Sequence, residues 1–430
     1  MLRRFSLYGF LKNQRYFEDW WLLAFMAKGI SFTTWGLLIG FRELMVNLME
    51  IPSGAIADLC GRRKSMILSF VAYIVSFVIF GAATYLPLLF LGMAFFAVGD
   101  AFRTGTHKAM IFTWLRLEGR AEERTKTYGY TRSWSKLGSA LCVLIAGAFV
   151  FISQRFEYTF YFAVIPYLLG IINFLGYPRE LDGEIDAGKR VSLKEVVVHL
   201  ADSLRDAARK ADLRRLVFES MGFEGVFKAA KDYLQPILMA AAAVWLGAFV
   251  VTEGLSKPQK TVLLASPVFF VLYLLSAAAS RNAHRLVDEP GEEDRSARLL
   301  WGLDLVAYAA LILAMFCGYR VPVILGFVAL YVMQNFWRPV LISRFDAHSH
   351  HTKKATILSI ESQAKSVSTM IVAPILGLAI DLVKARGMCP EGGEFWPIGV
   401  LGTLVALGFF LTARRALTRK DDATPQDSSG

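Results

Sequence analysis

Ionisable side chains stand inside long apolar stretches of this sequence, where a charge is costly unless it meets a partner or water. The cations nearest the middle of these stretches are Arg42, Arg103, Lys136, Arg338 and Lys365. Guanidinium and ammonium groups bind carboxylates and phosphates, and arginine can do so with two hydrogen bonds at once. Placed around one cavity, these cations would bind a small anionic or zwitterionic organic molecule.

Acidic residues share the same stretches: Glu43, Glu50, Glu219, Glu224 and Glu361. Buried carboxyl groups can take up and release protons, so each of these acids is a candidate for proton coupling. Glu224 and Glu361 stand one helical turn before a lysine, Lys228 and Lys365, which also suits an ion pair. Two interpretations of the cations therefore stay open, namely substrate binding and salt bridges between helices.

The overall composition explains how so many charges come to lie among apolar residues. The chain has 430 residues, of which 55% are hydrophobic, and its mean hydropathy is +0.44. Charged residues make up 19%, below the roughly one quarter of soluble domains. So much apolar surface requires lipid, and we expect an all-α polytopic membrane protein. The net charge of +11 is then explained by basic loops rather than by nucleic acid, for which we find no binding motif.

Apolar stretches long enough to cross a bilayer predict twelve transmembrane helices. The predicted spans are 16–30, 32–58, 65–84, 87–114, 125–152, 157–177, 214–250, 260–282, 298–316, 321–343, 354–383 and 395–413. Lys and Arg gather in the alternate connections that include both chain ends. By the positive-inside rule, both termini are cytoplasmic, and we expect a multi-pass protein of the inner (cytoplasmic) membrane.

The longest connection divides the predicted spans into six and six. We expect an N-terminal six-helix bundle at 1–177, a cytoplasmic linker at 178–213, a C-terminal six-helix bundle at 214–416 and a disordered tail at 417–430. Ser192 and Glu195 form a capping-box pattern in the linker. The apolar spacing that follows predicts an amphipathic helix on the membrane surface.

The two halves share a short pattern. Thr127, Ser133 and Lys136 recur with the same spacing as Thr356, Ser362 and Lys365, and Arg103 has a counterpart in Arg338. Such a repeat favours two pseudo-symmetric bundles with a substrate site between them.

The segment GAIADLCGRR connects the second and third predicted spans. Its residues Gly54, Asp58, Gly61, Arg62 and Arg63, here called the signature loop, resemble the motif G-x-x-x-D-x-x-G-R-[KR] of the major facilitator superfamily. We expect Gly54 to allow close helix approach, Gly61 a tight turn, and Asp58 to need a cationic partner. The resemblance implies a transporter that works by alternating access, with this loop as a latch on the cytoplasmic side. The cations alone would also satisfy the topology rule, but that rule requires neither Asp58 nor the glycines.

Two patterns found within that family are missing. Of the R-x-x-Q-G pattern of many proton antiporters only Arg103 has a counterpart, and the G-P-x-x-G-G turn of drug exporters is absent. We therefore expect a monomeric, proton-coupled secondary transporter of a small polar solute in a lipid bilayer. The alternatives are an efflux antiporter for amphipathic compounds, a lipid flippase or, in a different class, a non-transporting sensor. The sequence shows no nucleophile–base set, metal cluster or phosphate loop, so we expect no enzyme, cofactor or metal centre.

Overall fold

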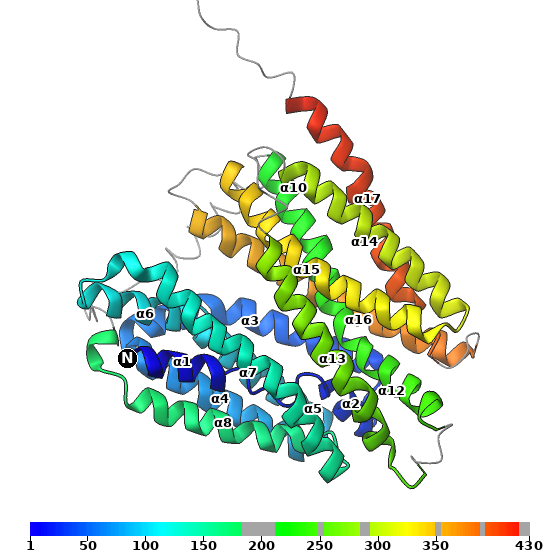
Figure 1. Ribbon diagram of the computed structural model, residues 1–430, viewed down its shortest axis with the longest axis horizontal. Helices are drawn as coiled ribbons and strands as arrows, with labels where there is room; N and C mark the ends of the chain where they lie inside the picture. Colours follow the sequence, from blue (N-terminus) through cyan, green and yellow to red (C-terminus); the bar gives the residue numbers. More distant parts are fainter. Residues whose placement is uncertain (183–210, 248–252, 284–292, 349–353, 388–391, 421–430) are drawn as a thin grey trace, which may run out of the picture.

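The computed structural model describes residues 1–182, 211–247, 253–283, 293–348, 354–387 and 392–420, and every regular element within these ranges is a helix (Figure 1). In the first half, residues 1–182, the α-helices are α1 (Leu2–Leu11), α2 (Trp21–Ala27), α3 (Phe32–Cys60), α4 (Arg62–Ala82), α5 (Leu86–Arg103), α6 (Thr106–Leu117), α7 (Arg124–Ser153) and α8 (Tyr158–Leu175). Two 3₁₀ turns, η1 (Ala121–Glu123) and η2 (Arg179–Asp182), complete this half.

The second half, residues 211–420, begins with a series of short helices. These are α10 (Ala211–Ser220), the π-helical turn η3 (Met221–Gly225), α11 (Val226–Ala230), the 3₁₀ turn η4 (Lys231–Tyr233) and α12 (Leu234–Trp245). Long helices follow: α13 (Lys257–Asn282), α14 (Glu293–Phe316), α15 (Arg320–His348), α16 (Lys354–Arg386) and α17 (Trp396–Lys420).

The surface of these helices is suited to lipid. Within the described ranges, eight segments are long and apolar enough to cross a membrane. Large apolar side chains point outward from them, with Ile172 on α8 63% exposed and Leu313 on α14 67% exposed. An apolar surface of this extent cannot be left in water. The expectation of an all-helical, multi-pass membrane protein is thus confirmed.

The first predicted span, 16–30, is wrong in its bounds, because the one helix within it is α2, which covers only Trp21–Ala27. Residues 2–11, expected to be a lead-in to the membrane, form α1, which packs against α7 and α8. A Cβ on Gly9 would lie 2.8 Å from the Thr131 carbonyl oxygen, and one on Gly138 would lie 2.7 Å from that of Phe10. The absence of these two side chains is what lets α1 approach α7 so closely.

Two other predicted spans are interrupted. The span 87–114 breaks between α5 and α6 at Gly105, whose φ of +77° is a conformation that favours glycine. The span 214–250 is built from the short helices α10 to α12. Pro236 has no N–H to donate to the carbonyl of residue 232, which explains why the α-helical pattern gives way to a 3₁₀ turn there.

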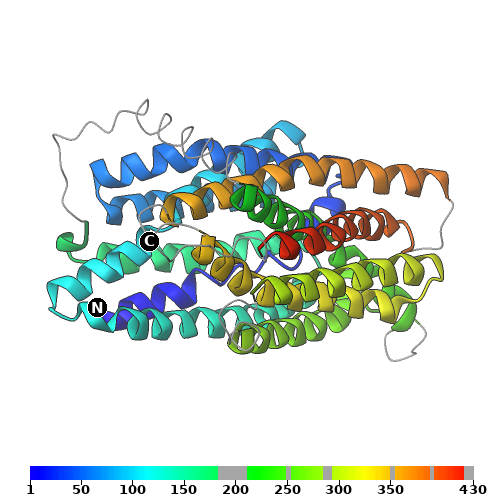
Figure 2. The ribbon, with the colours of Figure 1, turned by 90° about the horizontal axis from the view of Figure 1, so that it is seen from above.

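Contacts between the halves run mainly along two helix pairs, α3 with α16 and α7 with α13. In Figure 1 most helices of the first half lie below those of the second, and Figure 2 shows the same helices from above. Glycines allow the helices of the two halves to approach closely. A Cβ on Gly36 would lie 2.2 Å from the Ala373 carbonyl oxygen, a distance too short for any side chain to fit. One on Gly147 would lie 2.3 Å from Ser266 Oγ.

Two predictions fall wholly or partly outside the described residues. The amphipathic linker helix after Ser192 is one of them. The tail predicted at 417–430 is the other, although α17 continues to Lys420, so the first residues of that tail are helical.

Candidate functional site

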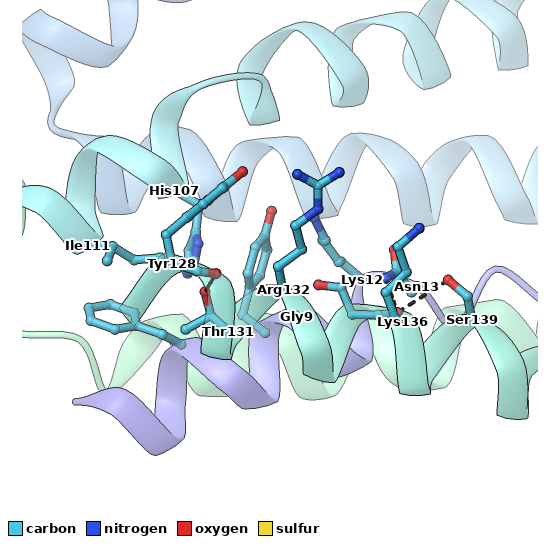
Figure 3. A pocket seen from close by; sticks show the side chains of 13 residues that line it. Gly9, Lys12, Asn13, His107, Ile111, Tyr128, Thr131, Arg132, Lys136 and Ser139 are labelled. Atoms are coloured by element: carbon cyan, nitrogen blue, oxygen red, sulfur yellow. Dashed lines mark hydrogen bonds between the residues drawn. The ribbon is translucent and has the colours of Figure 1, made fainter. Parts of the chain in front are cut away.

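A pocket of about 400 Å³ lies between α1, α6 and α7 (Figure 3). Three of its lining residues carry positive charge, namely Lys12, Arg132 and Lys136, and none of the described residues that line it is acidic. We call it the cationic pocket. Tyr8, Asn13, Tyr128, Thr131, Ser135 and Ser139 add hydroxyl and amide groups to its walls. Such a lining can bind the charged group of an anion and donate hydrogen bonds to it.

The chain that leaves α1 is fastened to α7 and so places Lys12 at this pocket. Asn13 Nδ2 donates to the Ser135 carbonyl oxygen at 2.5 Å, and Gln14 Nε2 donates to that of Gly138 at 3.0 Å. The ammonium group of Lys12 lies 5.5 Å from the centre of the Tyr8 ring, within the range of a cation–π contact.

Arg132 and Lys136 stand one helical turn apart on α7 and are both exposed. Among the residues with described side chains, no carboxylate lies within salt-bridge distance of either side chain, or of Lys12. Like charges this close repel one another, so an anion that enters the pocket gains the attraction of all three.

Aromatic rings form the wall of the cationic pocket at α6. His107 is 8% exposed, stacks on Tyr8 with 3.8 Å between ring centroids, and has its Nε2 3.2 Å from the Tyr177 hydroxyl oxygen. Phe5 meets the edge of the His107 ring. This packing fixes the wall that lies beside the three cations.

Arg103, a predicted substrate ligand, is held within the first half. Its Nη2 donates to Asp100 Oδ1 at 3.1 Å and its Nε to the Tyr73 hydroxyl oxygen at 3.1 Å. Arg15 Nη2 also donates to Asp100 at 3.5 Å, and the Tyr73 hydroxyl donates to the same oxygen. One half-buried carboxylate therefore holds two guanidinium groups.

Arg42 and Glu43 are brought together with a lysine from the other half. Arg42 Nη2 donates to Glu43 Oε1 at 2.5 Å, and Lys228 Nζ on α11 donates to Glu43 Oε2 at 2.6 Å. Glu43 is 1% exposed, so its charge is balanced almost entirely by these two cations.

Four of the predicted residues of the second half form one network. Arg338 Nη1 lies 3.1 Å from Glu224 Oε1 and 2.7 Å from Glu361 Oε1, while Lys365 Nζ lies 2.8 Å from Glu224 Oε2. The Ser220 hydroxyl also donates to Glu361. In this conformation these two cations therefore neutralise carboxylates, whereas Lys136, the repeat counterpart of Lys365, lines the cationic pocket.

The remaining predicted acids differ in their partners. Glu219 accepts from Arg215 Nε at 2.7 Å and from Arg344, which also donates to Asp294 at 2.8 Å. Glu50 on α3 accepts from Ser359 Oγ on α16 at 3.1 Å, a contact between the halves. Neither Glu219 nor Glu50 lines the cationic pocket.

The cations of the signature loop contact residues of their own half. Arg62 Nη1 donates to Thr113 Oγ1 at 2.8 Å, and the backbone N–H of Arg63 donates to Asp182 Oδ1 at 2.6 Å. Gly61 has φ +92°, which agrees with the expected tight turn. The side chain of Asp58 lies outside the described residues.

One expectation about the signature loop is not met in this conformation. A Cβ on Gly54 would meet no atom within 4 Å, so the close helix approach expected at this glycine is absent here.

Sequence reasoning did not identify Lys12 or Arg132 as candidate site residues. The miss follows from starting the first span at residue 16, which left Lys12 in a cytoplasmic segment. The signal that could have found it is the series Phe5, Tyr8 and Leu11, apolar residues at three-residue spacing that form the buried face of α1.

Comparison with solved structures shows similar folds at low sequence identity. The nucleoside transporter NupG matches with a TM-score of 0.75 and 11% identity over 96% of this chain and 98% of that chain. A POT family transporter in complex with 5-aminolevulinic acid matches with a TM-score of 0.69 and 16% identity over 96% of each chain. A D-xylose-proton symporter matches with a TM-score of 0.61 and 14% identity, over 95% of this chain and 96% of that one.

Sequence comparison supplies the family. No curated protein matches the chain. The sequence model of the Major Facilitator Superfamily, however, matches residues 19–371, most of its length. The resemblance seen in the signature loop is thereby confirmed, and the chain belongs to the Major Facilitator Superfamily.

Proposed function

We propose that the protein is a secondary active transporter that moves a small anionic or zwitterionic organic solute by alternating access. Its twelve spans form two six-helix bundles, 1–177 and 214–416, with both termini in the cytoplasm. The observation that carries the proposal is the cationic pocket, where Lys12, Arg132 and Lys136 meet no carboxylate among the described lining residues. A cavity lined by basic side chains without a carboxylate partner attracts an anion more strongly than a comparable neutral solute.

The contacts between the halves support alternating access. Asp381 on α16 accepts from the backbone N–H of Thr33 at 2.7 Å and from its hydroxyl at 2.6 Å, at the first turn of α3. At the C-terminal end of α7, Gln259 Nε2 donates to the Phe151 carbonyl oxygen at 3.1 Å. With cytoplasmic termini, both contacts lie on the outer side. The halves are therefore joined on that side in this conformation, and we propose that the cationic pocket is reached from the cytoplasm.

Coupling to protons is part of the proposal. Glu43, Glu219, Glu224 and Glu361 each contact at least one cation. Protonation of such a carboxylate would release its cation and so favour the opening of the contact between them. A proton symporter among the similar structures supports this choice of energy source.

A lipid flippase is the second candidate, because a separate groove lies on the other side of α1. It has a volume of about 640 Å³ and is lined by Leu7, Phe10, Tyr130 and Trp134, with Arg3 also in its wall. An acyl chain fits such apolar walls, and an anionic headgroup suits both Arg3 and the cationic pocket. An efflux antiporter for amphipathic drugs is less well supported, since it requires an apolar substrate cavity and the cationic pocket is not apolar.

Uptake into proteoliposomes tests the proposed substrate class. Purified protein is assayed with labelled organic anions, zwitterionic amino acids, cationic dyes and fluorescent phospholipids. We expect anion uptake that falls about ten- to hundred-fold in Lys136→Ala and Arg132→Ala, the effect of losing one charge-assisted hydrogen bond. Lys126→Ala, which removes an exposed cation from the same helix, is the control and should transport normally. Transport of dyes alone, or of phospholipids alone, would refute the anion proposal.

The energy source needs a separate assay. An inwardly directed proton gradient or its reverse should drive accumulation of the transported anion in the same vesicles. Uptake that is indifferent to the gradient would exclude proton coupling and would leave facilitated transport as the function.

A further inference from the structure

A carboxylate from the first half is buried against the second half at a point that neither motif nor repeat marks. Asp19 lies between α1 and α2, is 6% exposed, and its Oδ1 accepts a hydrogen bond from the Tyr273 hydroxyl on α13 at 2.8 Å. The ring of the neighbouring Trp20 meets that of Phe269, one turn away on α13. Asp19 therefore takes part directly in the contact between the halves.

Asp19 differs in its partners from the buried acids Glu43 and Glu361. Each of those two has an arginine or lysine nitrogen within 4 Å. Within the part of the chain that the structure describes, Asp19 has no such partner, and Tyr273 supplies its one side-chain hydrogen bond. A buried carboxylate without a cation is the costliest kind to keep charged.

The groups around Asp19 do not replace the missing cation. Glu18 precedes it in the chain, and Lys231 and Asp232 of η4 face it with 3.5 Å between Lys231 Nζ and Asp232 Oδ1. Tyr331 on α15 and Cys142 on α7 also lie near it, and both are uncharged in their usual forms. Arg15 is the nearest arginine in sequence, and its side chain contacts Asp100 and Glu18. Two acids and one already paired lysine leave the surroundings unfavourable to a further negative charge.

The backbone on both sides of Asp19 is fastened to the second half as well. Gln235 Nε2 on α12 donates to the Glu18 carbonyl oxygen at 3.1 Å, and the Leu22 N–H donates to Gln235 Oε1 at 3.0 Å. Asp19 cannot reach water without disturbing these contacts, so its charge and the contact between the halves are linked.

We propose that Asp19 is a proton-binding site whose protonated form holds residues 18–22 against α12 and α13 and whose ionised form releases them. This inference rests on the proposed proton-coupled transport and adds Asp19 to the carboxylates that bind protons. The step is a simple protonation, in which one carboxylate oxygen gains a proton from water and no other bond changes. Neutral Asp19 favours the conformation seen here, and the charged form favours one in which water reaches the carboxylate.

The test follows the distance between the halves and needs no substrate. Spin labels are placed by Ile152→Cys on α7 and Lys257→Cys on α13, which flank the contact of Phe151 with Gln259, in a background without native cysteines. Distances are measured by double electron–electron resonance from pH 5 to 8.5. We expect one short distance at low pH and a growing longer population as the pH rises. Asp19→Asn should keep the short distance at every pH.

Two further variants make the result specific. Asp304→Asn removes another buried carboxyl, 3% exposed on α14, and should titrate like the parent protein. Tyr273→Phe retains the acid but loses the hydrogen bond, so it should keep the pH dependence and populate the longer distance more at each pH. If Asp19→Asn does not fold, Tyr273→Phe provides the test of the Asp19 contact in its place.

Specific outcomes overturn the inference. A parent protein whose distances do not change with pH, or an Asp19→Asn variant that titrates like the parent, excludes Asp19 as the proton site. Loss of the pH dependence in Asp304→Asn alone would assign the proton to that residue instead. None of these results depends on anion uptake, so a failure here leaves the proposed substrate class intact and is separable from a failure of the cationic pocket.

Discussion

The ammonium group of Lys228 on α11 lies 2.6 Å from Glu43 Oε2 on α3, and so joins the two halves through a buried ion pair. Arg42 contacts the other oxygen of the same carboxylate. Three charges from two halves are thus balanced in one place. Their arrangement shows that some cations within apolar helices serve contact between the halves.

Replacing Glu43 by Gln should strongly destabilise the protein. The change leaves Arg42 and Lys228 without the carboxylate that they share. Removing one partner of a buried ion pair costs about 3–5 kcal/mol of folding free energy. The measurement is thermal unfolding in detergent. Glu50→Gln, which affects one hydrogen bond with Ser359, is the control and should cost about 1 kcal/mol. The added change Lys228→Met should restore part of the loss, and an unchanged melting temperature in Glu43→Gln would contradict this role.

Arg338→Ala and Lys136→Ala should separate cations that hold the fold from cations that bind substrate. Arg338 contacts Glu361, which is 0% exposed, so its loss should lower the melting temperature clearly. Lys136 is exposed and lines the cationic pocket, so its loss should leave the melting temperature unchanged and reduce anion uptake. Both variants are compared by thermal unfolding and proteoliposome uptake. Stable, inactive Arg338→Ala protein would show instead that Arg338 contacts the substrate.

Gly36→Ala should push α3 away from α16. The added methyl group would lie 2.2 Å from the Ala373 carbonyl oxygen, and such overpacking costs about 1–3 kcal/mol. Gly408→Ala on α17 is the matched control, because a Cβ there meets no atom within 4 Å and alanine favours the helix by up to about 1 kcal/mol. Thermal unfolding measures both. Equal melting temperatures for the two variants would show that α3 and α16 tolerate separation.

Asp381→Ala should weaken the closed outer side. The carboxylate caps the first turn of α3 across the contact between the halves, and loss of a cap costs about 0.5–2 kcal/mol. Spin labels at Ser31 and Lys384 should therefore report a longer distance in the variant. Thr33→Val removes the hydroxyl but leaves the backbone donors, so its effect should be smaller. A variant with the parent's distance distribution would exclude a gating role for Asp381.

Composition and local pattern were sufficient for the fold class and the positions of most helices. The predicted span 32–58 corresponds to α3 and 125–152 to α7, within a few residues, because apolar length and breaks in hydropathy are local properties. The breaks in 2–27, 87–114 and 211–245 escaped prediction. They depend on close approach of neighbouring helices and on single residues such as Gly105 and Pro236, which leave hydropathy unchanged.

The candidate site was predictable only in part. Lys136 was identified from its depth and its repeat, and it does line the cationic pocket. Its counterpart Lys365 had the same local signal but lies beside Glu224, on a helix remote in sequence. Charge and depth alone could not separate the two positions, because the difference lies in which acid the neighbouring helix presents.

Composition and short motifs are enough to establish that this chain lies in lipid, that it is helical, and, through the signature loop, to which family it belongs. These follow from hydrophobicity and short motifs, which each residue carries wherever the chain folds. The packing of the helices was needed to show which charges are neutralised, which face the cationic pocket, and that Asp19 contacts Tyr273. Salt bridges and cavities arise from distances between helices far apart in sequence, and the free energy of a buried charge depends on those neighbours.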